Sequence, residues 1–226
     1  MGRTVKRDKD HARAVLWDMD GTLLDSAEYH WLAWREALAA EGYALTREQF
    51  AGTFGQRNDT ILRAHFGPGF PMGEIDRIGA IKELRYRELV RTHGVETLPG
   101  VRRWLERLSA SGWRQAVASA APRLNIDAIL DALGLASRFD AIVSAEDVER
   151  GKPDPQVFLT AAARLGASPA RCVVVEDAPA GVEGAHRAGM RSIGVLTTHP
   201  DLPADRVVRT LDELPDEAFD ELIPDT

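Results

Sequence analysis

Five short runs of apolar residues recur along this chain, with helical patterns between them. The runs are AVLW (14–17), QAVAS (115–119), AIVS (141–144), CVVVE (172–176) and SIGVL (192–196). Strands that are buried on both faces are apolar at consecutive positions, and strands that alternate with helices pair in parallel. The pattern therefore predicts an α/β fold with a doubly wound, Rossmann-like parallel sheet that helices cover on both faces.

One of the intervening helices carries its own start and stop signals. In KPDPQVFLTAAARLGA, Asp154 is a good N-cap residue and Pro155 fits the first helical position. Gly166 is expected to end the helix. The apolar stripe between them consists of Phe158, Ala161, Ala162 and Leu165.

The segment between the first two apolar runs breaks this rhythm, because residues 27–96 are helical in pattern throughout. A crossover between parallel strands needs only about a dozen residues. We therefore expect an all-helical cap domain at 27–96, inserted into an α/β catalytic core made of 14–26 and 97–226. Residues 1–13 read as a disordered basic tail. Within the cap, Trp31, Trp34 and Leu38 are expected to be core residues.

The composition excludes several classes of function. The net charge of −7 argues against a nucleic-acid partner, because phosphate backbones need clustered Lys and Arg. No run approaches the roughly 18 apolar residues of a membrane span, and the N-terminus lacks a signal-like stretch. We expect a cytoplasmic monomer that binds no membrane. Cys172, the only cysteine, lies in an apolar run and is expected to be a buried thiol.

Polar residues follow the apolar runs at the positions where the strands should end. In open parallel sheets, ligands lie beyond the carboxyl ends of the strands. Several segments are therefore expected to meet at one edge of the sheet and to bring together carboxylates, a hydroxyl and an ammonium. These residues are Asp18, Asp20, Ser119, Lys152, Glu176 and Asp177.

Three of these carboxylates, on Asp18, Glu176 and Asp177, offer the hard oxygen ligands that suit Mg²⁺. A phosphate group would add about two negative charges. Two like unit charges repel by roughly 4 kcal/mol at about 4 Å and an effective dielectric constant of about 20. A carboxylate could attack a phosphoryl group only if cations offset that repulsion. Mg²⁺ and the ammonium of Lys152 would do so.

Asp18 and Asp20 are two positions apart, so in an extended chain they face the same side. Asp18 could then present a nucleophilic oxygen while Asp20 exchanges a proton with the leaving or attacking oxygen. That role needs a protonated Asp20. Raising its pKa from about 3.9 to near 7 requires roughly 4 kcal/mol of environmental bias. We expect a neighbouring carboxylate and the exclusion of water to raise this pKa.

The motifs DMDGTLLDS, AVASA, GKPDP and VVVEDAPAGVEGAHRAGM occur in this order. They resemble the four motifs of the haloacid dehalogenase superfamily, and the resemblance extends from about residue 14 to 214. The helical insert looks like the C1 cap of the subfamily that contains β-phosphoglucomutase and many sugar-phosphate phosphatases. The resemblance implies that Asp18 is the nucleophile and Asp20 the general acid and base. Ser119 and Lys152 would then hold the phosphoryl oxygens.

The same resemblance implies a Mg²⁺ site. Its ligands would be the Asp18 carboxylate, the backbone carbonyl of Asp20 and the Asp177 carboxylate. Glu176 would lie at the metal or just beyond it.

The resemblance extends to the cap, where it implies substrate contacts. His30 matches a histidine of the first cap helix, Arg57 an arginine that holds a distal phosphate, and Lys82 a lysine that faces the site. Together with Ala120, these residues are expected to bind the substrate. Pro122 and Arg123, however, stand where the mutases have a lysine and an asparagine on phosphate.

We therefore expect a Mg²⁺-dependent phosphomonoester hydrolase that acts on a small phosphorylated metabolite, most simply a sugar phosphate. A hexose-phosphate mutase of the β-phosphoglucomutase type is the alternative. A signalling receiver domain also phosphorylates an aspartate, but it needs neither Asp20 nor a helical cap and is about half this length.

Overall fold

The computed structural model describes residues 12–224, so most of the expected basic tail lies outside the described residues. The sheet has six parallel strands in the order β3-β2-β1-β4-β5-β6. The strands are β1 (Ala14–Trp17), β2 (Arg114–Ala118), β3 (Ala141–Val143), β4 (Cys172–Glu176), β5 (Arg191–Val195) and β6 (Arg206–Val208). The doubly wound parallel sheet is confirmed. Its edge strand β6 was not predicted, because its three residues form no extended apolar run.

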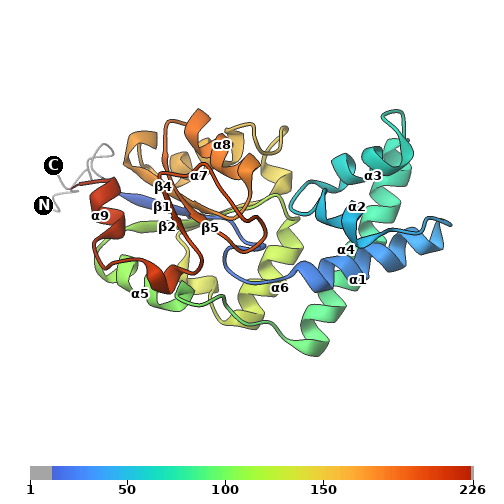
Figure 1. The fold of residues 1–226 in the computed structure, drawn as a ribbon, viewed down its shortest axis with the longest axis horizontal. Coiled ribbons are helices and arrows are strands. Elements are labelled where there is room, and N and C mark those ends of the chain that lie inside the picture. The colour runs from blue at the N-terminus through green and yellow to red at the C-terminus, as the bar shows by residue number, and fades with distance from the viewer. Residues whose placement is uncertain (1–11, 225–226) are drawn as a thin grey trace, which may run out of the picture.

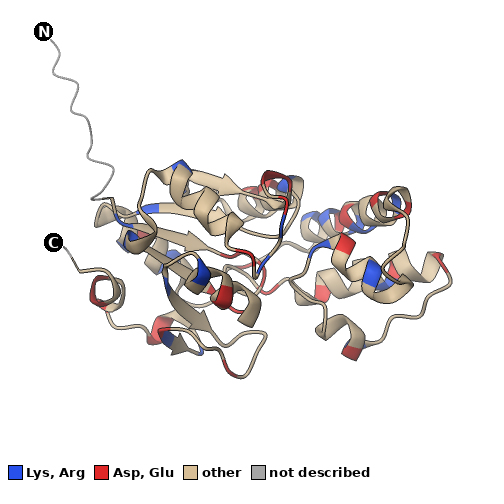
Figure 2. Cartoon of the chain, turned by 90° about the horizontal axis from the view of Figure 1, so that it is seen from above, with Lys and Arg blue, Asp and Glu red and all other residues tan. Residues whose placement is uncertain are grey.

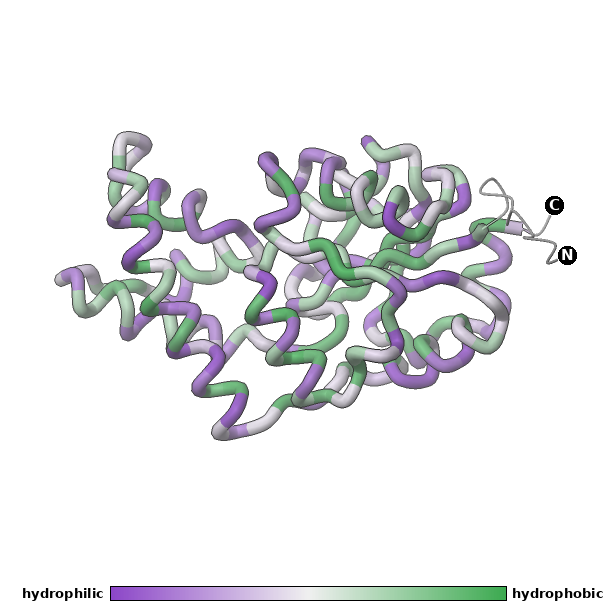
Figure 3. The backbone as a smooth tube through the Cα atoms, turned by 180° about the vertical axis from the view of Figure 1, so that it is seen from behind, coloured by the Kyte–Doolittle hydropathy of each residue, from purple (hydrophilic) through white to green (hydrophobic). Residues whose placement is uncertain are grey.

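Helices cover both faces of the sheet (Figure 1). On one side lie α5 (Val101–Ala110), α6 (Arg123–Leu133) and α9 (Ala218–Leu222), and on the other α7 (Gln156–Leu165) and α8 (Pro179–Arg187). Strand β1 serves both cores: Val15 and Trp17 belong to the first, and Ala14 and Leu16 to the second. Figure 3 shows the strands as a hydrophobic band between more polar helices.

Four helices between β1 and α5 form a separate unit beside the sheet, as Figure 1 shows. They are α1 (Ala27–Ala40), α2 (Arg47–Ala51), α3 (Asn58–Phe66) and α4 (Met72–His93). This unit has its own hydrophobic core, in which Trp31, Trp34 and Leu38 are buried as expected. None of the helices between residues 12 and 224 is long and apolar enough to cross a membrane.

Helix α7 begins one residue later than predicted. Pro155 occupies the N-cap position, and the helix starts at Gln156. The Asp154 carboxylate still accepts a hydrogen bond from the Gln156 backbone N–H at 3.0 Å. Asp154 therefore satisfies a donor of the first turn, although it lies one residue before the N-cap. The predicted apolar stripe is buried, and Gly166 ends the helix in the left-handed conformation.

Candidate active site

Three acidic side chains meet at the carboxyl ends of β1 and β4. Asp18 directly follows β1, Glu176 is the last residue of β4 and Asp177 comes next. Because β1 and β4 are paired neighbours, the three carboxylates converge, and one oxygen of each lies within 4.8 Å of the others. All three residues are buried. Figure 2 shows acidic segments gathered where the sheet faces the helical unit.

The ammonium of Lys152 lies between two of these carboxylates. Its Nζ donates to Asp18 Oδ1 and, at 2.6 Å, to Glu176 Oε1. Burial alone would lower the pKa of Lys152, but the charges of Asp18 and Glu176 outweigh burial and raise this pKa above its usual range. Lys152 is therefore a permanent cation, and it offsets part of the negative charge of the cluster.

Lys152 does not neutralise the whole cluster, and the pKa values of Asp18 and Asp177 show that their ionised forms are disfavoured. Burial, with further contributions from nearby carboxylates, raises the pKa of Asp18 and brings that of Asp177 to about 7. Glu176 already accepts from Lys152 with one oxygen and from the backbone N–H groups of Asp177 and Ala178, both at 3.0 Å, with the other. Because their pKa values are raised, Asp18 and Asp177 would gain most from binding a hard divalent cation. Such a cation would relieve their repulsion.

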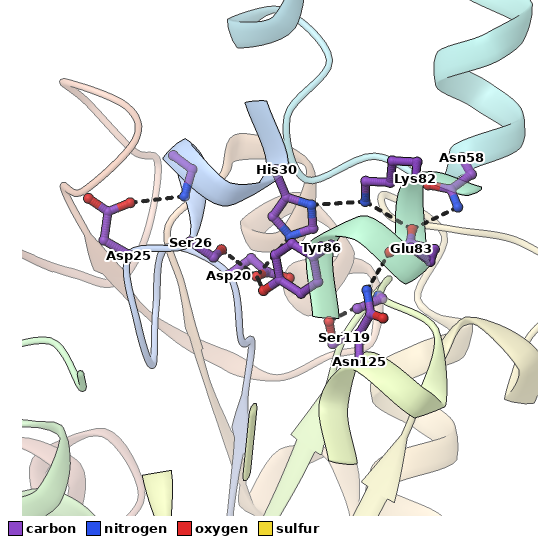
Figure 4. A network of polar contacts seen from close by, with 12 residues as sticks. Asp20, Asp25, Ser26, His30, Asn58, Lys82, Glu83, Tyr86, Ser119 and Asn125 are labelled. Atoms are coloured by element: carbon purple, nitrogen blue, oxygen red, sulfur yellow. Dashed lines mark hydrogen bonds and ion pairs between the residues drawn. The ribbon is translucent and has the colours of Figure 1, made fainter. Parts of the chain in front are cut away.

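Asp20 is held by two side chains of the helical unit and by Ser26, which directly precedes α1 (Figure 4). Its Oδ1 accepts from Ser26 Oγ, from His30 Nε2 at 3.2 Å and from Tyr86 O–H at 3.4 Å. Lys82 Nζ lies 2.9 Å from His30 Nδ1. Because an ammonium can only donate, Nδ1 is the acceptor and Nε2 carries the hydrogen that points at Asp20.

The expectation of a raised pKa for Asp20 is wrong for this arrangement. Burial does raise the pKa, but the interaction with His30, followed by the Ser26 hydroxyl and the charge of Lys82, lowers it by more, and the net shift is downward. The physical reason is the neighbourhood. We expected a carboxylate beside Asp20, whereas the structure places hydrogen-bond donors and a cation there.

All of the predicted site residues line one cavity of about 590 Å³ between the sheet edge and the helical unit. Ser119 is buried there, and its Oγ accepts from the Ala121 backbone N–H at 3.1 Å. The predicted residues on the cavity wall are Asp18, Asp20, His30, Arg57, Lys82, Ser119, Ala120, Lys152, Glu176 and Asp177.

The two cap cations already have partners. Arg57 Nη1 donates to the backbone carbonyls of Ala145 (3.3 Å) and Val148 (3.1 Å), and its Nε donates to Asp59. Arg57 thus links the helical unit to the core. Lys82 Nζ donates to Glu83 Oε1 at 2.9 Å as well as to His30. Both side chains reach the cavity wall as bonded members of networks.

Arg123 does not replace the missing phosphate ligands. Its guanidinium pairs with Asp127 at 2.8 Å on the exposed side of α6. Pro122, which lacks a backbone N–H, lines the cavity instead.

Sequence reasoning missed several residues of the site. Thr198 and His199 follow β5 and contact Asp177: Thr198 Oγ1 donates to its Oδ2, and His199 Nδ1 lies 3.2 Å from its backbone oxygen. The rule that picked out the other strand ends would have found them. Tyr86 lies one helical turn after Lys82 and so shares its face. Glu83 also lines the cavity, and no signal in the sequence marked it.

The fold and this site define a hydrolase family. Residues 12–189 match the model of the haloacid dehalogenase-like hydrolases. The chain is 35% identical to β-phosphoglucomutase of Bacillus subtilis (strain 168), with 89% of this chain and 91% of the relative covered. It is 36% identical to hexitol phosphatase A of Escherichia coli (strain K12), with 85% of each covered.

Among solved structures, CbbY from Rhodobacter sphaeroides in complex with xylulose-(1,5)bisphosphate superimposes with a TM-score of 0.82 at 26% identity. The match covers 90% of this chain and 96% of CbbY. The chain therefore belongs to the haloacid dehalogenase-like hydrolase family, and the receiver-domain interpretation is excluded.

Proposed function

We propose that this protein is a Mg²⁺-dependent phosphomonoester hydrolase that acts on small sugar phosphates through an aspartyl-phosphate intermediate. One observation carries the proposal. A single cavity is lined by the acidic cluster, by Lys152 and Ser119, and by Asp20, which His30 holds. Relatives named for hexitol and β-glucose phosphate chemistry support a sugar phosphate as the substrate class.

In the proposed reaction, Asp18 attacks phosphorus, an oxygen–phosphorus bond forms and the bond to the leaving oxygen breaks. Asp20 donates a proton to that oxygen. Water then attacks phosphorus while it gives a proton to Asp20, the bond between Asp18 and phosphorus breaks, and inorganic phosphate leaves. Lys152 and Ser119 hold the phosphoryl oxygens. Asp18 and Asp177 would hold Mg²⁺, which supplies positive charge to the phosphoryl group.

The described contacts of Asp20 all fall on Oδ1, which leaves Oδ2 for the leaving oxygen. Because its pKa is lowered in the free protein, the protonated form of Asp20 is expected only when a bound phosphate adds negative charge nearby.

We further propose that residues 27–96 act as a cap over a catalytic core made of residues 14–26 and 97–226. The contacts of Arg57 support the role of residues 27–96 as a cap. Its side chain lines the cavity and donates to backbone carbonyls of the core. Substrate specificity would then depend on the cap residues His30, Arg57 and Lys82.

A phosphatase is favoured over a mutase, although a mutase is among the relatives. A mutase must hold both ends of a bisphosphate while the intermediate turns over. Here Arg57 and Lys82 are already bonded, and Pro122 offers no donor. The deciding assay is incubation with Mg²⁺, β-glucose 1-phosphate and a trace of the 1,6-bisphosphate. Free phosphate should appear faster than glucose 6-phosphate, and the reverse order would identify a mutase.

The substrate class itself is best tested by a panel of phosphorylated metabolites, including hexitol phosphates, with the purified protein and Mg²⁺. Release of phosphate from several sugar phosphates is the expected result. Failure to hydrolyse any phosphomonoester would contradict the proposed function.

A further inference from the structure

A buried glutamate forms part of the cap side of the cavity. Glu83 in α4 is only 6% exposed and lines the cavity. Its Oε1 accepts from Lys82 Nζ at 2.9 Å and from Asn58 Nδ2 at 2.8 Å, and its Oε2 accepts from Asn125 Nδ2 (Figure 4). Burial opposes ionisation, but the charge of Lys82 and the hydrogen bonds from Lys82 and Asn125 lower the pKa of Glu83, so it remains a carboxylate.

This carboxylate changes what the cap end of the cavity can bind. The ammonium of Lys82 is paired with Glu83, and the guanidinium of Arg57 contacts the Asp59 carboxylate at 3.3 Å. The Asp59 carboxylate also contacts Arg63 Nη1 at 3.0 Å, so each of these cations is already paired with a carboxylate. A second phosphate group would have to compete with Glu83 for Lys82 and with Asp59 for Arg57.

A second, smaller cavity points to the same conclusion. Its volume is about 400 Å³, and it shares Glu83 and Arg57 with the main cavity. The acidic residues Asp59, Asp76 and Glu146 also line it. The space beyond Glu83 is thus acidic, so a dianion that extended past the cap wall would be repelled there as well.

We propose that Glu83 is a specificity-determining residue that selects phosphomonoesters with an uncharged, hydroxyl-bearing far end and rejects bisphosphates. A carboxylate has about four acceptor positions, and three donors occupy Glu83 here, so one position remains for a substrate hydroxyl. Phosphate oxygens without protons can only accept, and they gain nothing from this group. The inference rests on the proposed function, since it concerns the substrate of the same site.

Binding and turnover test the two proposals separately. Hydrolysis of p-nitrophenyl phosphate by the unaltered protein with Mg²⁺ tests the hydrolase. Calorimetric titration in an Asp18→Asn background tests the role of Glu83, with fructose 1-phosphate and fructose 1,6-bisphosphate as ligands. These two ligands differ only in the second phosphate. We expect the monophosphate to bind at least about tenfold more tightly. Equal affinities, a tighter bisphosphate, or no binding of the monophosphate would overturn the inference.

Substitution of Glu83 gives the second arm of this experiment. Glu83→Gln in the same background keeps the shape and removes the charge, and it should reduce the preference for the monophosphate about tenfold. Glu88→Gln removes the same charge from an exposed position of α4 and should leave the ratio of affinities unaltered. Circular dichroism checks that each variant is folded. A folded Glu83→Gln protein that keeps the full preference would overturn the role of Glu83. If that variant does not fold, the ratio of the affinities for fructose 1-phosphate and fructose 1,6-bisphosphate in the Asp18→Asn protein still decides the inference.

Discussion

At the scale of single residues, Asp18 is the side chain on which the proposed chemistry depends most directly. Asp18→Asn should lower hydrolysis of p-nitrophenyl phosphate by at least about 100-fold, because an amide is a far poorer nucleophile than a carboxylate. The fold should persist, since the substitution removes one of three crowded negative charges. Asp131→Asn, at an exposed position of α6, is the matched control and should keep full activity. More than a few per cent of residual activity in Asp18→Asn would rule out a covalent mechanism.

Cys172 shows how burial alone determines reactivity. Its side chain is buried, as expected from the sequence, and its Sγ donates to the Ser168 backbone oxygen at 3.3 Å. Burial raises the pKa of the thiol to about 12. The reactive thiolate is therefore scarce at pH 8. Iodoacetamide should label Cys172 only after denaturation, as mass spectrometry would show. Rapid labelling of the folded protein would contradict this environment.

At the scale of secondary-structure elements, β1 and β4 hold three carboxylates at adjacent strand ends, and the loop before α7 supplies the compensating cation. Lys152→Ala should be nearly inactive. It should also melt at a lower temperature in EDTA than the parent, because Asp18 and Glu176 would lose their shared cation. Mg²⁺ should restore part of that loss. The measurement is thermal unfolding of both proteins with and without Mg²⁺, and an unaltered difference between them would argue against a shared metal site.

The raised pKa of Asp177, at the end of β4, predicts how metal binding depends on pH. Asp177 has a folded pKa of about 7, well above its usual value, because of burial and of Glu176. A carboxyl whose pKa is higher in the folded protein than in the unfolded chain lowers the free energy of unfolding as the pH rises above the pKa of the unfolded chain. The loss reaches its full size once the pH is above the pKa of the folded protein. Mg²⁺ binds the ionised form and offsets this cost. The increase in melting temperature on adding Mg²⁺ should therefore be larger at pH 8 than at pH 5.5. A larger increase at pH 5.5 would contradict the assignment.

At the scale of the whole molecule, the positions of the strands and of the residues at their ends could be predicted from the sequence. The pairing of the charged side chains could not. Asp18, Ser119, Glu176 and Asp177 could be placed together because parallel strands end at one edge of a sheet. Neighbouring residues on a helix do not ordinarily face each other. Lys82 nevertheless turns back to the adjacent Glu83, because packing against His30 and α6 leaves both side chains buried in one place. That arrangement depends on how the helical unit packs against the core, which no local pattern contains.

Asn125 connects the two parts of the molecule. It is a fully buried residue of α6 in the core, and it contacts α4 of the helical unit twice. Its Nδ2 donates to Glu83, and its Oδ1 accepts from Arg87 Nη1 at 2.8 Å. Through Glu83, Lys82 and His30 this contact continues to Asp20 (Figure 4). The position of the helical unit and the orientation of the proposed proton donor are thus held by one chain of hydrogen bonds.

The last prediction tests that connection. Asn125→Leu keeps a similar volume but removes both hydrogen bonds, which leaves Arg87 and one oxygen of Glu83 without this partner. Helices α1 and α4 should then exchange their amide hydrogens faster, while the central strands β1 and β4 should be unaffected. Leu124→Ala changes the exposed neighbouring residue and serves as the control. Hydrogen exchange followed by mass spectrometry measures both regions in one experiment. Equal acceleration in the helices and in the strands would mean that Asn125 stabilises the whole fold, and that it does not specifically hold the helical unit against the core.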